Sequence, residues 1–345
     1  MRDIIITGGA GFTGTNAAAH YLHRGHKVTV FDNLSRKGCL ENVKWLEGLP
    51  RAENLKLIIG DLRNPPTDLR AAVESADAVF HYAGQVAVTT SVADPRSDFE
   101  LNALGTFNML ELVRTSRGKK PILFFSSTNK VYGGMEDVAI VENEQSYAYR
   151  DFPEGMSEDR LLDFHSPYGC SKGTADQYVR DYSRTYGLQT VVFRQSCIYG
   201  RRQFGIEDQG WVAWFTIAAM LGKPITIYGD GKQVRDVLFV DDLICAYEHA
   251  WDSIEKTQGR VYNIGGGPEN TISLLQLLEF LKSEMNLPTS PAFSDWRIGD
   301  QPVYVSNIKK AEREFGWRPS THWTDGVRTL AEWVKQNKTL LEKLF

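Results

Sequence analysis

The sequence has 345 residues, a length that at roughly 150 residues per domain predicts two lobes, or one large domain with a smaller appended part. Hydrophobic residues make up 42% and charged residues 24%, which is ordinary globular composition and excludes a disordered, collagenous or coiled-coil chain. The net charge of -4 and a pI near 6.0 give no global field that would attract nucleic acid or an anionic membrane. Any anion must therefore be held by a local site.

Two features bear on the compartment in which the protein works. The longest mostly apolar stretch, Trp211–Leu221, is shorter than the roughly 18 residues of a membrane-spanning helix, and the first residues lack a secretory pattern. The four cysteines, at positions 39, 170, 197 and 245, form no C-x-x-C pair, so neither a zinc knuckle nor a disulfide framework is indicated. We therefore expect a soluble, cytoplasmic protein with reduced thiols.

Short apolar runs alternate with helical patterns through the first half of the chain. This alternation predicts a parallel sheet, because parallel strands need crossover helices that cover both faces of the sheet. One crossover helix is expected over 98–117, where apolar residues recur at helical spacing. The predicted strands are Asp3–Thr7, Lys27–Phe31, Leu55–Ile59, Ala78–Tyr82, Pro121–Phe125 and Gln189–Phe193.

Beyond about Tyr199 the regular alternation stops, although Val240–Trp251, Ile272–Met285 and Thr324–Leu344 keep helical periodicity. The stretch 237–265 ends in the apolar run Val261–Ile264 and is expected to return to the large sheet. We therefore predict an α/β fold with two parts. They are a Rossmann-type doubly wound parallel sheet from residues 1–198 and 237–265, and a smaller C-terminal substrate-binding lobe from residues 199–236 and 266–345.

A glycine-rich turn follows the first predicted strand, with glycines at positions 8, 11 and 14. Glycine lets the backbone turn tightly and approach a pyrophosphate, whose charge is met by amide groups and the positive end of the next helix. Such a turn can also serve packing alone, so its context decides. The second strand is followed by Asp32, about 20 residues on, where a carboxylate can accept hydrogen bonds from both ribose hydroxyls. This context favours a dinucleotide site.

The dinucleotide is expected to be NAD. Asp32 repels a 2'-phosphate and so disfavours NADP, although Arg36 and Lys37 nearby keep NADP open. The turns after the third and fourth strands are placed to contact the adenine and to border the cofactor. The residues predicted to bind NAD are Gly8, Gly11, Phe12, Thr13, Gly14, Asp32, Asn33, Ser35, Arg36, Asp61, Leu62, Ala83, Gln85, Ser126, Tyr168 and Lys172.

Two further segments lie where an open parallel sheet places its chemistry, beyond the carboxyl ends of strands. Residues 126–133 follow the fifth strand and begin with three hydroxyl side chains, Ser126, Ser127 and Thr128. Tyr168 and Lys172 stand at i and i+4 and share one helix face. Such a pair is common on helix surfaces, but combined with a dinucleotide site and a hydroxyl-bearing strand end it predicts catalysis.

The chemistry explains these residue types. A free phenol titrates near 10, so a tyrosine base acting near pH 7 needs its pKa lowered by about 3 units, roughly 4 kcal/mol. The Lys172 ammonium and a positively charged nicotinamide can supply that stabilisation. Tyr168 then takes a hydroxyl proton while NAD accepts the hydride from the same carbon, and Thr128 hydrogen-bonds the developing carbonyl oxygen. The predicted catalytic residues are therefore Thr128, Tyr168 and Lys172.

These motifs together resemble the extended short-chain dehydrogenase/reductase superfamily along almost the whole chain. Within it, several longer segments are similar to the CDP-paratose 2-epimerase family, also called CDP-tyvelose 2-epimerases. The segments are Phe31–Gly38, Ala83–Ala87, Asp163–Gly173, Asp208–Trp211 and Gly231–Asp236. The resemblance implies a tightly held NAD and a nucleotide-linked deoxysugar, and it gives the hydroxyl, tyrosine and lysine roles to Thr128, Tyr168 and Lys172.

One departure within the superfamily bears on the reaction. Sugar-nucleotide 4,6-dehydratases place an Asp-Glu pair directly after the catalytic threonine, because eliminating water needs an acid and a base besides the tyrosine. Here those positions are Asn129 and Lys130. Neither is a carboxylic acid, so a reaction that needs only hydride removal and return is favoured over dehydration.

The sugar nucleotide is expected to contact residues of both parts of the chain. Arg235 and Arg297 resemble the pyrophosphate-binding arginines of the superfamily, since a guanidinium fork suits phosphate oxygens, but both can also be solvated loop arginines. Trp211 and Trp214 stand at helical spacing and are interpreted as core. The residues predicted to bind substrate are Gln85, Thr128, Asn129, His165, Gln209, Arg235 and Arg297. No metal is predicted, because His20, His23 and His26 lie on or just after the first helix without an acidic or thiol partner.

These inferences predict an NAD-dependent epimerase that inverts C2 of a nucleotide-linked sugar, with a CDP-sugar favoured, in the manner of CDP-paratose to CDP-tyvelose. The hydrogen on C2 is not acidic while the sugar is an acetal, so inversion needs a transient ketone. A nucleotide-sugar 4-epimerase stays open, since the same residues serve either carbon. A catalytically silent NAD-binding regulator also stays open, but it would not need Thr128, Tyr168 and Lys172 together.

Assembly is the last expectation. Helices 98–117 and 168–186 are expected on one side of the sheet, and in the resembled superfamily this pair often forms a symmetric four-helix dimer interface. A homo-oligomer, either dimer or tetramer, with no nucleic-acid or membrane partner, is therefore predicted.

Overall fold

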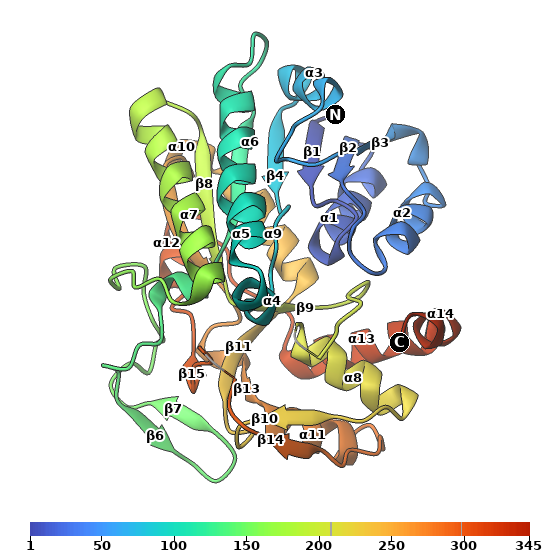
Figure 1. Ribbon diagram of the computed structural model, residues 1–345, viewed down its shortest axis with the longest axis vertical. Coiled ribbons are helices and arrows are strands. Elements are labelled where there is room, and N and C mark those ends of the chain that lie inside the picture. Colours follow the sequence, from blue (N-terminus) through green and yellow to red (C-terminus); the bar gives the residue numbers. More distant parts are fainter. Residues whose placement is uncertain (208, 298) are drawn as a thin grey trace. The chain divides into compact units, whose positions relative to one another are not determined.

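The computed structural model describes residues 1–207, 209–297 and 299–345 (Figure 1). Residues 208 and 298, which fall within or beside two motifs discussed above, lie outside the described residues. The chain forms two compact units. The first consists of Met1–Val131, Ser166–Arg194 and Tyr247–Tyr262, and the second of Tyr132–His165, Gln195–Ala246 and Asn263–Phe345.

The first unit is organised by a seven-stranded sheet with the order β12-β8-β5-β4-β1-β2-β3. Its strands from β3 to β5 pair in parallel, and the order reverses direction between β1 and β4, as in doubly wound folds. This confirms the predicted Rossmann-type class. The strands are β1 Asp3–Thr7, β2 Lys27–Asp32, β3 Leu55–Ile59, β4 Ala78–His81, β5 Ile122–Thr128, β8 Thr190–Gln195 and β12 Arg260–Ile264.

Helices cover both faces of this sheet, because successive strand residues point to opposite sides. Val79 of β4 joins a buried apolar cluster with α3 (Thr67–Ser75), α6 (Gly105–Arg114) and α7 (Ser166–Tyr186). Its neighbour Phe80 packs its ring against Tyr21 of α1 (Phe12–His23) and Tyr247 of α9 (Val240–Asp252). The predicted placement of the helices near 98–117 and 168–186 on one side of the sheet is confirmed (Figure 1).

The segment predicted as one helix over 98–117 begins earlier, ends earlier and is interrupted. It consists of α5 (Pro95–Phe99), a π-helical turn Glu100–Leu104, and α6. The start lies at Pro95 because the Asp94 side chain accepts a hydrogen bond from Ser97 N at 3.0 Å, and proline suits the first helical position. Turns of π-helix inside helices often mark functional positions, and this one lies beside α7.

The second unit is built from short strands and a few longer helices around its own apolar cluster. β9, β11, β13 and β15 form one small sheet, β10 pairs with β14, and β6 with β7 makes a hairpin. Its strands are β6 Ile140–Glu142, β7 Tyr147–Tyr149, β9 Cys197–Tyr199, β10 Thr226–Tyr228, β11 Val234–Phe239, β13 Thr271–Ser273, β14 Ala292–Ser294 and β15 Val303–Tyr304. Its helices include α8 Trp211–Leu221, α11 Leu274–Ser283, α12 Lys309–Phe315, α13 Trp323–Gln336 and α14 Lys338–Leu344.

Two predicted helices of this unit need correction. The first, Ile272–Met285, begins only at Leu274, because Ser273 and Gln276 form a capping box and the residues before it pair as strand β13. The second, Thr324–Leu344, divides at Asn337, whose side-chain amide donates to Trp333 O at 2.8 Å and ends α13. None of the described helices combines the length and hydropathy that crossing a bilayer requires.

The two compact units also differ from the lobe boundaries expected from sequence. Residues 132–165, expected in the Rossmann part, belong to the second unit, where β7 contacts β15 and Tyr147 N donates to Lys232 O at 3.0 Å. Residues 237–246 also belong to it, because β11 pairs with β9 and β13 rather than with the large sheet. Only the later part of 237–265, through β12, joins that sheet.

Candidate active site

The glycine turn between β1 and α1 is held by close backbone packing. Gly8 has φ 67°, and a Cβ there would lie 2.7 Å from the backbone N of Ala83, just beyond β4. A Cβ at Gly14 would lie 2.3 Å from Gly8 O, so neither position accepts a side chain. Gly11, the residue that precedes α1, has no side chain to cap the helix, and no other described side chain does so. The first amide groups of α1, from Phe12 and Thr13 onward, are therefore left to solvent or a bound anion. The turn therefore has the backbone geometry that a pyrophosphate needs.

Asp32 lies directly at the end of β2 and is 9% exposed. One carboxylate oxygen accepts from Ala10 N at 3.0 Å and the other from Leu34 N at 2.8 Å. Burial raises the pKa of Asp32, although the two backbone hydrogen bonds and Arg36 oppose the shift. Asp32 thus joins the glycine turn to the loop after β2, and its carboxylate chemistry fits the hydroxyl groups of an NAD ribose.

The other predicted NAD residues of the loops after β2 and β3 form a second polar group. Asp61 accepts from Arg63 Nη2 at 2.7 Å and from Asn33 Nδ2 at 3.4 Å, and the Arg63 hydrogen bonds lower the pKa of Asp61 to about 2. Ser35 N donates to Asn33 Oδ1 at 3.1 Å, which orders the loop. Leu62 is buried beside them. Their predicted contact with the adenosine half of NAD stays a prediction.

Gln85 has its side-chain amide engaged within the chain. Its Nε2 donates to Ala87 O at 2.6 Å and to Asp98 Oδ1 at 3.1 Å, while its Oε1 accepts from Ala87 N. Its backbone N donates to Asn102 Oδ1 at 2.9 Å. Gln85 therefore orders the loop after β4, and the predicted contact of its side chain with cofactor or substrate stays a prediction.

The three predicted catalytic residues come together from β5 and α7. The hydroxyl of Tyr168 is hydrogen-bonded to that of Thr128, the last residue of β5. Lys172, one helical turn after Tyr168, donates to Ser126 O, and its Nζ lies 4.3 Å from the ring centre of Phe125. The side chains of Thr128, Tyr168 and Lys172 are all buried. The carboxyl end of β5 thus positions the hydroxyl, the phenol and the ammonium in one group.

The electrostatics of this group differ from the expectation. Burial raises the pKa of Tyr168 to about 12, although the Thr128 hydrogen bond and the Arg36 charge lower it. Burial also lowers the pKa of Lys172 to about 7, against the opposing charges of Asp176 and Asp98. The residues of the chain therefore leave Tyr168 a neutral phenol at neutral pH, because desolvation outweighs the nearby charges. The lowering that a tyrosine base needs must come from positive charge bound beside it.

Asn129 and Lys130 follow Thr128 in a short 3-10 turn, Asn129–Tyr132. Asn129 accepts from the Thr128 hydroxyl at 3.3 Å, and Lys130 N donates to the same hydroxyl at 3.2 Å. The turn thus orients Thr128 without placing a carboxylic acid beside it. The predicted substrate contact of Asn129 stays a prediction.

Sequence reasoning missed two buried groups near Lys172. Asp176 accepts from Arg194 Nε at 3.0 Å, from Arg194 Nη2 at 3.1 Å and from the Ser127 hydroxyl at 2.8 Å. His81, the last residue of β4, lies between the Thr7 and Thr106 hydroxyls, and burial together with the Lys172 charge lowers its pKa to about 3. Asp176 follows Lys172 at i+4, so the helical spacing that identified the Tyr-Lys pair could have found it.

The remaining predicted substrate residues lie in the second unit. Arg235 pairs with Asp300 at 2.6 Å, and the Arg297 guanidinium lies 3.9 Å from the ring centre of Tyr228. His165 lies 3.1 Å from an Asp163 oxygen, and the backbone of Gln209 pairs with that of Ile206. Contact of these four residues with a sugar nucleotide stays a prediction. Trp211 and Trp214 pack against the apolar cluster of this unit, as expected for core residues.

Two groups of side chains bear on metal binding. His20, expected to have no acidic partner, lies 3.0 Å from Glu248, so that expectation is wrong; Arg24 binds the same carboxylate. Within the described residues, one group of three possible ligands has its atoms within 4.8 Å of one another, namely Glu136, Asp163 and His165. Both of its carboxylates are exposed, which is common without a metal.

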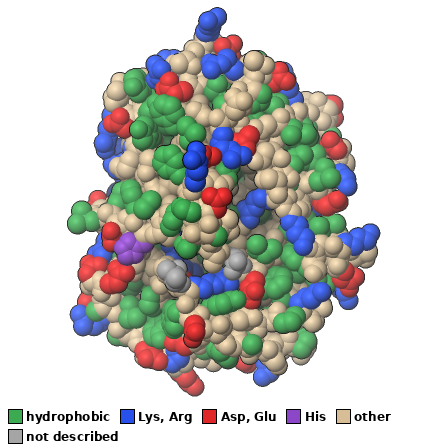
Figure 2. Space-filling model, in the orientation of Figure 1, with side chains coloured by type: hydrophobic (Ala, Val, Ile, Leu, Met, Phe, Trp, Pro, Cys, Tyr) green, Lys and Arg blue, Asp and Glu red, His purple; other side chains and the backbone are tan. Residues whose placement is uncertain are grey.

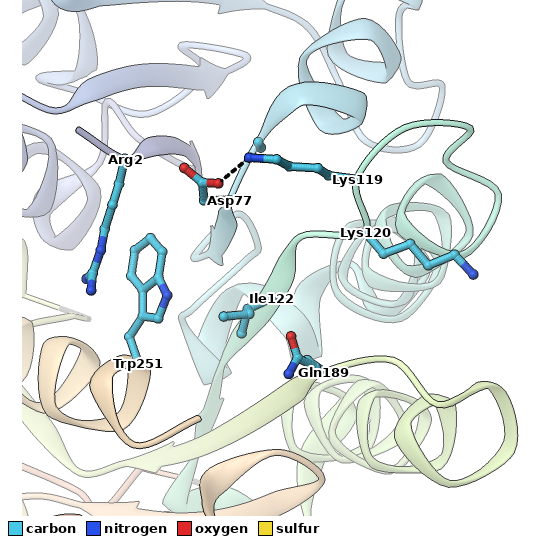
Figure 3. A pocket seen from close by; sticks show the side chains of 8 residues that line it. Arg2, Asp77, Lys119, Lys120, Ile122, Gln189 and Trp251 are labelled. Atoms are coloured by element: carbon cyan, nitrogen blue, oxygen red, sulfur yellow. Dashed lines mark hydrogen bonds and ion pairs between the residues drawn. The ribbon is translucent and has the colours of Figure 1, made fainter. Parts of the chain in front are cut away.

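A hollow of about 430 Å³ lies at the opposite, amino edge of the seven-stranded sheet (Figure 3). Of the charged side chains that line it, Lys119 pairs with Asp77 at 2.7 Å and Arg2 pairs with Asp252 at 2.7 Å, and Lys120 also lines the hollow. The Arg2 guanidinium also lies 4.2 Å from the ring centre of Trp251. On the face drawn in Figure 2, basic and acidic side chains are interspersed, in keeping with the net charge of -4.

The sheet, the glycine turn and the Thr-Tyr-Lys group define a class of protein. The chain belongs to the NAD dependent epimerase/dehydratase family, whose model matches residues 4–265. It is similar to CDP-paratose 2-epimerase of Salmonella typhi, with 46% identity over 337 residues that cover 96% of this chain and 98% of the relative. The resemblance found in the sequence is thereby confirmed.

Solved structures agree with this assignment. The chain resembles UDP-glucose 4-epimerase from Thermotoga maritima with UDP-glucose, at a TM-score of 0.81 and 31% identity, over 98% of this chain and 99% of that one. It also resembles a double mutant of dTDP-glucose 4,6-dehydratase from Streptomyces venezuelae with NAD bound. For that pair the TM-score is 0.83 and the identity 27%, over 100% of both chains.

Proposed function

We propose that the protein is an NAD-dependent epimerase that inverts C2 of a nucleotide-linked sugar, of the type that converts CDP-paratose to CDP-tyvelose. The observation that carries the proposal is the 46% identity to a CDP-paratose 2-epimerase over nearly the full length of both chains. The buried group of Thr128, Tyr168 and Lys172 supports it, because these residues can exchange a proton with a sugar hydroxyl.

Tyr168, Thr128 and Lys172 have different roles in the proton transfer. Bound NAD supplies the hydride chemistry and a positive charge. Tyr168, as phenolate, takes the proton of the C2 hydroxyl, and Thr128 hydrogen-bonds the oxygen as it becomes a carbonyl. Lys172, held by Ser126 O, keeps a positive charge beside the phenol. After the keto-sugar has presented its other face, C2 takes back the hydride, Tyr168 returns the proton to the oxygen, and the hydroxyl is restored.

The residues after Thr128 support epimerisation over dehydration. Elimination of water needs an acid and a base besides Tyr168, and Asn129 and Lys130 provide no carboxylic acid. The Asn129 side chain instead contacts the Thr128 hydroxyl. The reaction proposed here needs only a base at the C2 hydroxyl.

NAD is proposed to stay bound through the catalytic cycle, held by the Gly8–Gly14 turn and Asp32. Release between the two half-reactions would strand the keto-sugar. Purified protein is therefore expected to yield nicotinamide dinucleotide when it is denatured and the supernatant is analysed by mass spectrometry. Protein that contains none and does not respond to added NAD would contradict the proposal.

A homodimer through α6 and α7 is proposed for the assembly. The two helices carry a row of aromatic side chains, in which the rings of Phe107 and Tyr178 lie 5.8 Å apart and those of Tyr182 and Tyr186 lie 4.8 Å apart. Phe107, Tyr178 and Tyr186 are 37%, 46% and 48% exposed, and an exposed aromatic patch of this kind marks an interaction site. Light scattering of wild-type protein and of Tyr178→Arg tests this, and a wild-type monomer at micromolar concentration would refute it.

The substrate is tested by product analysis. NMR of reactions with a panel of CDP-, UDP- and GDP-sugars is expected to show inversion at C2, with a CDP-sugar preferred. Inversion at C4 would identify a 4-epimerase instead, and no turnover of any sugar would favour a regulator. We further propose a cytoplasmic location, because the four free cysteines fit a reducing compartment.

A further inference from the structure

Asp98 is a buried carboxylate beside the proposed catalytic group. It lies on α5, next to the π-helical turn, and is 1% exposed. Its oxygens accept hydrogen bonds from the Ser171 hydroxyl, from Asn102 Nδ2 at 3.1 Å and from Gln85 Nε2 at 3.1 Å. Ser171 stands between Tyr168 and Lys172 on α7 and also donates to Tyr168 O at 3.2 Å. Asp98 therefore contacts the helix turn that carries the tyrosine and the lysine.

The hydrogen-bond pattern shows which form of Asp98 the site favours. The amide groups of Asn102 and Gln85 donate to its oxygens and the Ser171 hydroxyl can donate too, so an ionised, acceptor-only carboxylate satisfies all three contacts. Burial raises the pKa of Asp98, but the Ser171 hydrogen bond and the Lys172 charge oppose that shift. The hydrogen bonds and the Lys172 charge thus offset part of the cost of burying a negative charge at Asp98.

Two buried carboxylates act on Lys172, and they differ in how they are compensated. Asp176 has the larger effect on the pKa of Lys172, and it also forms a buried ion pair with Arg194. Asp98 takes part in no ion pair among the described residues. Lys172 is the cation whose charge acts on it. Asp176 thus has Arg194 as a partner besides Lys172, whereas Asp98 is compensated by the charge of Lys172.

We propose that Asp98 is a positioning residue whose carboxylate keeps Lys172 in its ammonium form and so sets the pH range in which the Tyr168–Lys172 pair can exchange a proton. The proposal rests on the roles proposed above for Tyr168 and Lys172. Without a counter-charge, burial would favour neutral Lys172 near neutral pH. Asp98 opposes the loss of the Lys172 proton. It does so from its position on α5, outside the space proposed for the sugar hydroxyl.

Other polar and charged groups also face Lys172 and Tyr168. Lys172 faces Ser126 O and the Phe125 ring from β5, Asp176 from α7 and neutral His81 from β4. Tyr168 faces Thr128 from β5 and the Arg36 charge. Asp98 is the group common to both, since its negative charge raises the pKa of Lys172 and that of Tyr168. Removing that charge must therefore move both titrations to lower pH.

The test is a titration of Tyr168 in NAD-loaded protein by ultraviolet absorbance of tyrosinate. Each protein is compared with its Tyr168→Phe counterpart, so that only Tyr168 contributes to the difference. Asp98→Asn is expected to lower the midpoint by about 1 pH unit or more, the size typical of a nearby charge. Both limbs of the kcat/KM profile are expected to move to lower pH by a similar amount. The absorbance titration needs no turnover, so it decides the role of Asp98 even if no sugar is epimerised.

Two control variants separate charge from structure. Asp94→Asn removes the same charge from the exposed start of α5 and is expected to leave the midpoint unchanged. Ser171→Ala removes the hydrogen bond but keeps the charge, and is expected to shift the midpoint far less than Asp98→Asn. An unchanged midpoint in Asp98→Asn, or an equal shift in either control, would overturn the proposal.

A second measurement covers the case in which Asp98→Asn alone folds poorly. Lys172→Met leaves Asp98 as an uncompensated buried charge, so the Tm loss of Lys172→Met is expected to shrink when Asp98→Asn is also present. Additive Tm losses in this cycle would show that the two charges do not depend on each other, and would contradict the proposal.

Discussion

The two edges of the seven-stranded sheet differ in how their charges are arranged. At the carboxyl edge, Lys172 and Asp98 are 5% and 1% exposed. At the amino edge, the side chains of Lys119 and Asp77 are 64% and 29% exposed, and they pair with each other beside the hollow of Figure 3. The hollow is lined by charged side chains at the surface, whereas at the carboxyl edge burial lowers the pKa of Lys172 to about 7.

The comparison shows which property identifies an active site in this fold. The exposed ion pairs beside the hollow contribute little to the stability of the protein, because water already solvates those charges. Burial of a lysine, a phenol and a carboxylate in one place is costly, and it is typical of sites that move protons. The predictions below test whether the two edges differ in function as they differ in burial.

The largest effect is expected at Tyr168. Tyr168→Phe removes the proposed base and is expected to reduce kcat by roughly 10²–10⁴-fold, the usual contribution of general acid–base catalysis. Circular dichroism and NAD content are expected to match the wild type, since the phenyl ring is kept. Wild-type turnover in this variant would remove Tyr168 as the base.

The next effect concerns stability at the same edge. Arg194→Met leaves Asp176 buried without its cation, and breaking a buried pair in this way costs about 3–5 kcal/mol. Urea unfolding monitored by circular dichroism measures the change. A loss below about 1 kcal/mol, the range of surface ion pairs, would show that burial at this edge has no special energetic weight.

A smaller loss is expected at Thr128. Thr128→Val keeps the size of the side chain but removes the hydroxyl that contacts Tyr168, and loss of a hydrogen bond to developing charge lowers kcat about 10²–10³-fold. Steady-state kinetics with KM measured separately is the test. Thr128→Ser, which keeps the hydroxyl, is the matched control and is expected to retain most activity.

The smallest effect is expected at the amino edge. Lys119→Met removes the exposed partner of Asp77 beside the hollow, and both turnover and Tm are expected to stay close to those of the wild type. Kinetics and a thermal scan of this variant provide the reference for the other predictions. A large fall in turnover would mean that the hollow takes part in function and that the comparison of edges is wrong.

The sequence could predict the parts of this site that depend on local spacing. The glycine turn, Asp32 and the Tyr168–Lys172 pair each lie within one short segment whose strand or helix is evident from periodicity. The seven-stranded sheet was equally accessible, since β1 and β3 have the predicted bounds Asp3–Thr7 and Leu55–Ile59.

Other features depend on contacts between distant segments and could not be predicted in this way. Asp98 meets Ser171 across 73 positions, and on its own it is an ordinary polar residue near the start of a helix. The burial that raises the pKa of Tyr168 also depends on packing between β5 and α7, so the sequence alone could not predict it. In the second unit, strands of two or three residues such as β15 and β9 are too short for a periodic pattern.

Transient oxidation at C2 is the central claim, and isotope transfer tests it most directly. The hydrogen on C2 should leave and return without exchange with water, because Tyr168 is the base for the hydroxyl and not for the hydrogen on C2. Asn129 and Lys130 stand at the positions of a second acid and base, and neither is a carboxylic acid. Substrate deuterated at C2 is therefore expected to give product deuterated at C2, and reaction in heavy water is expected to leave C2 unlabelled, as read by NMR. Solvent deuterium at C2 of the product would contradict the account.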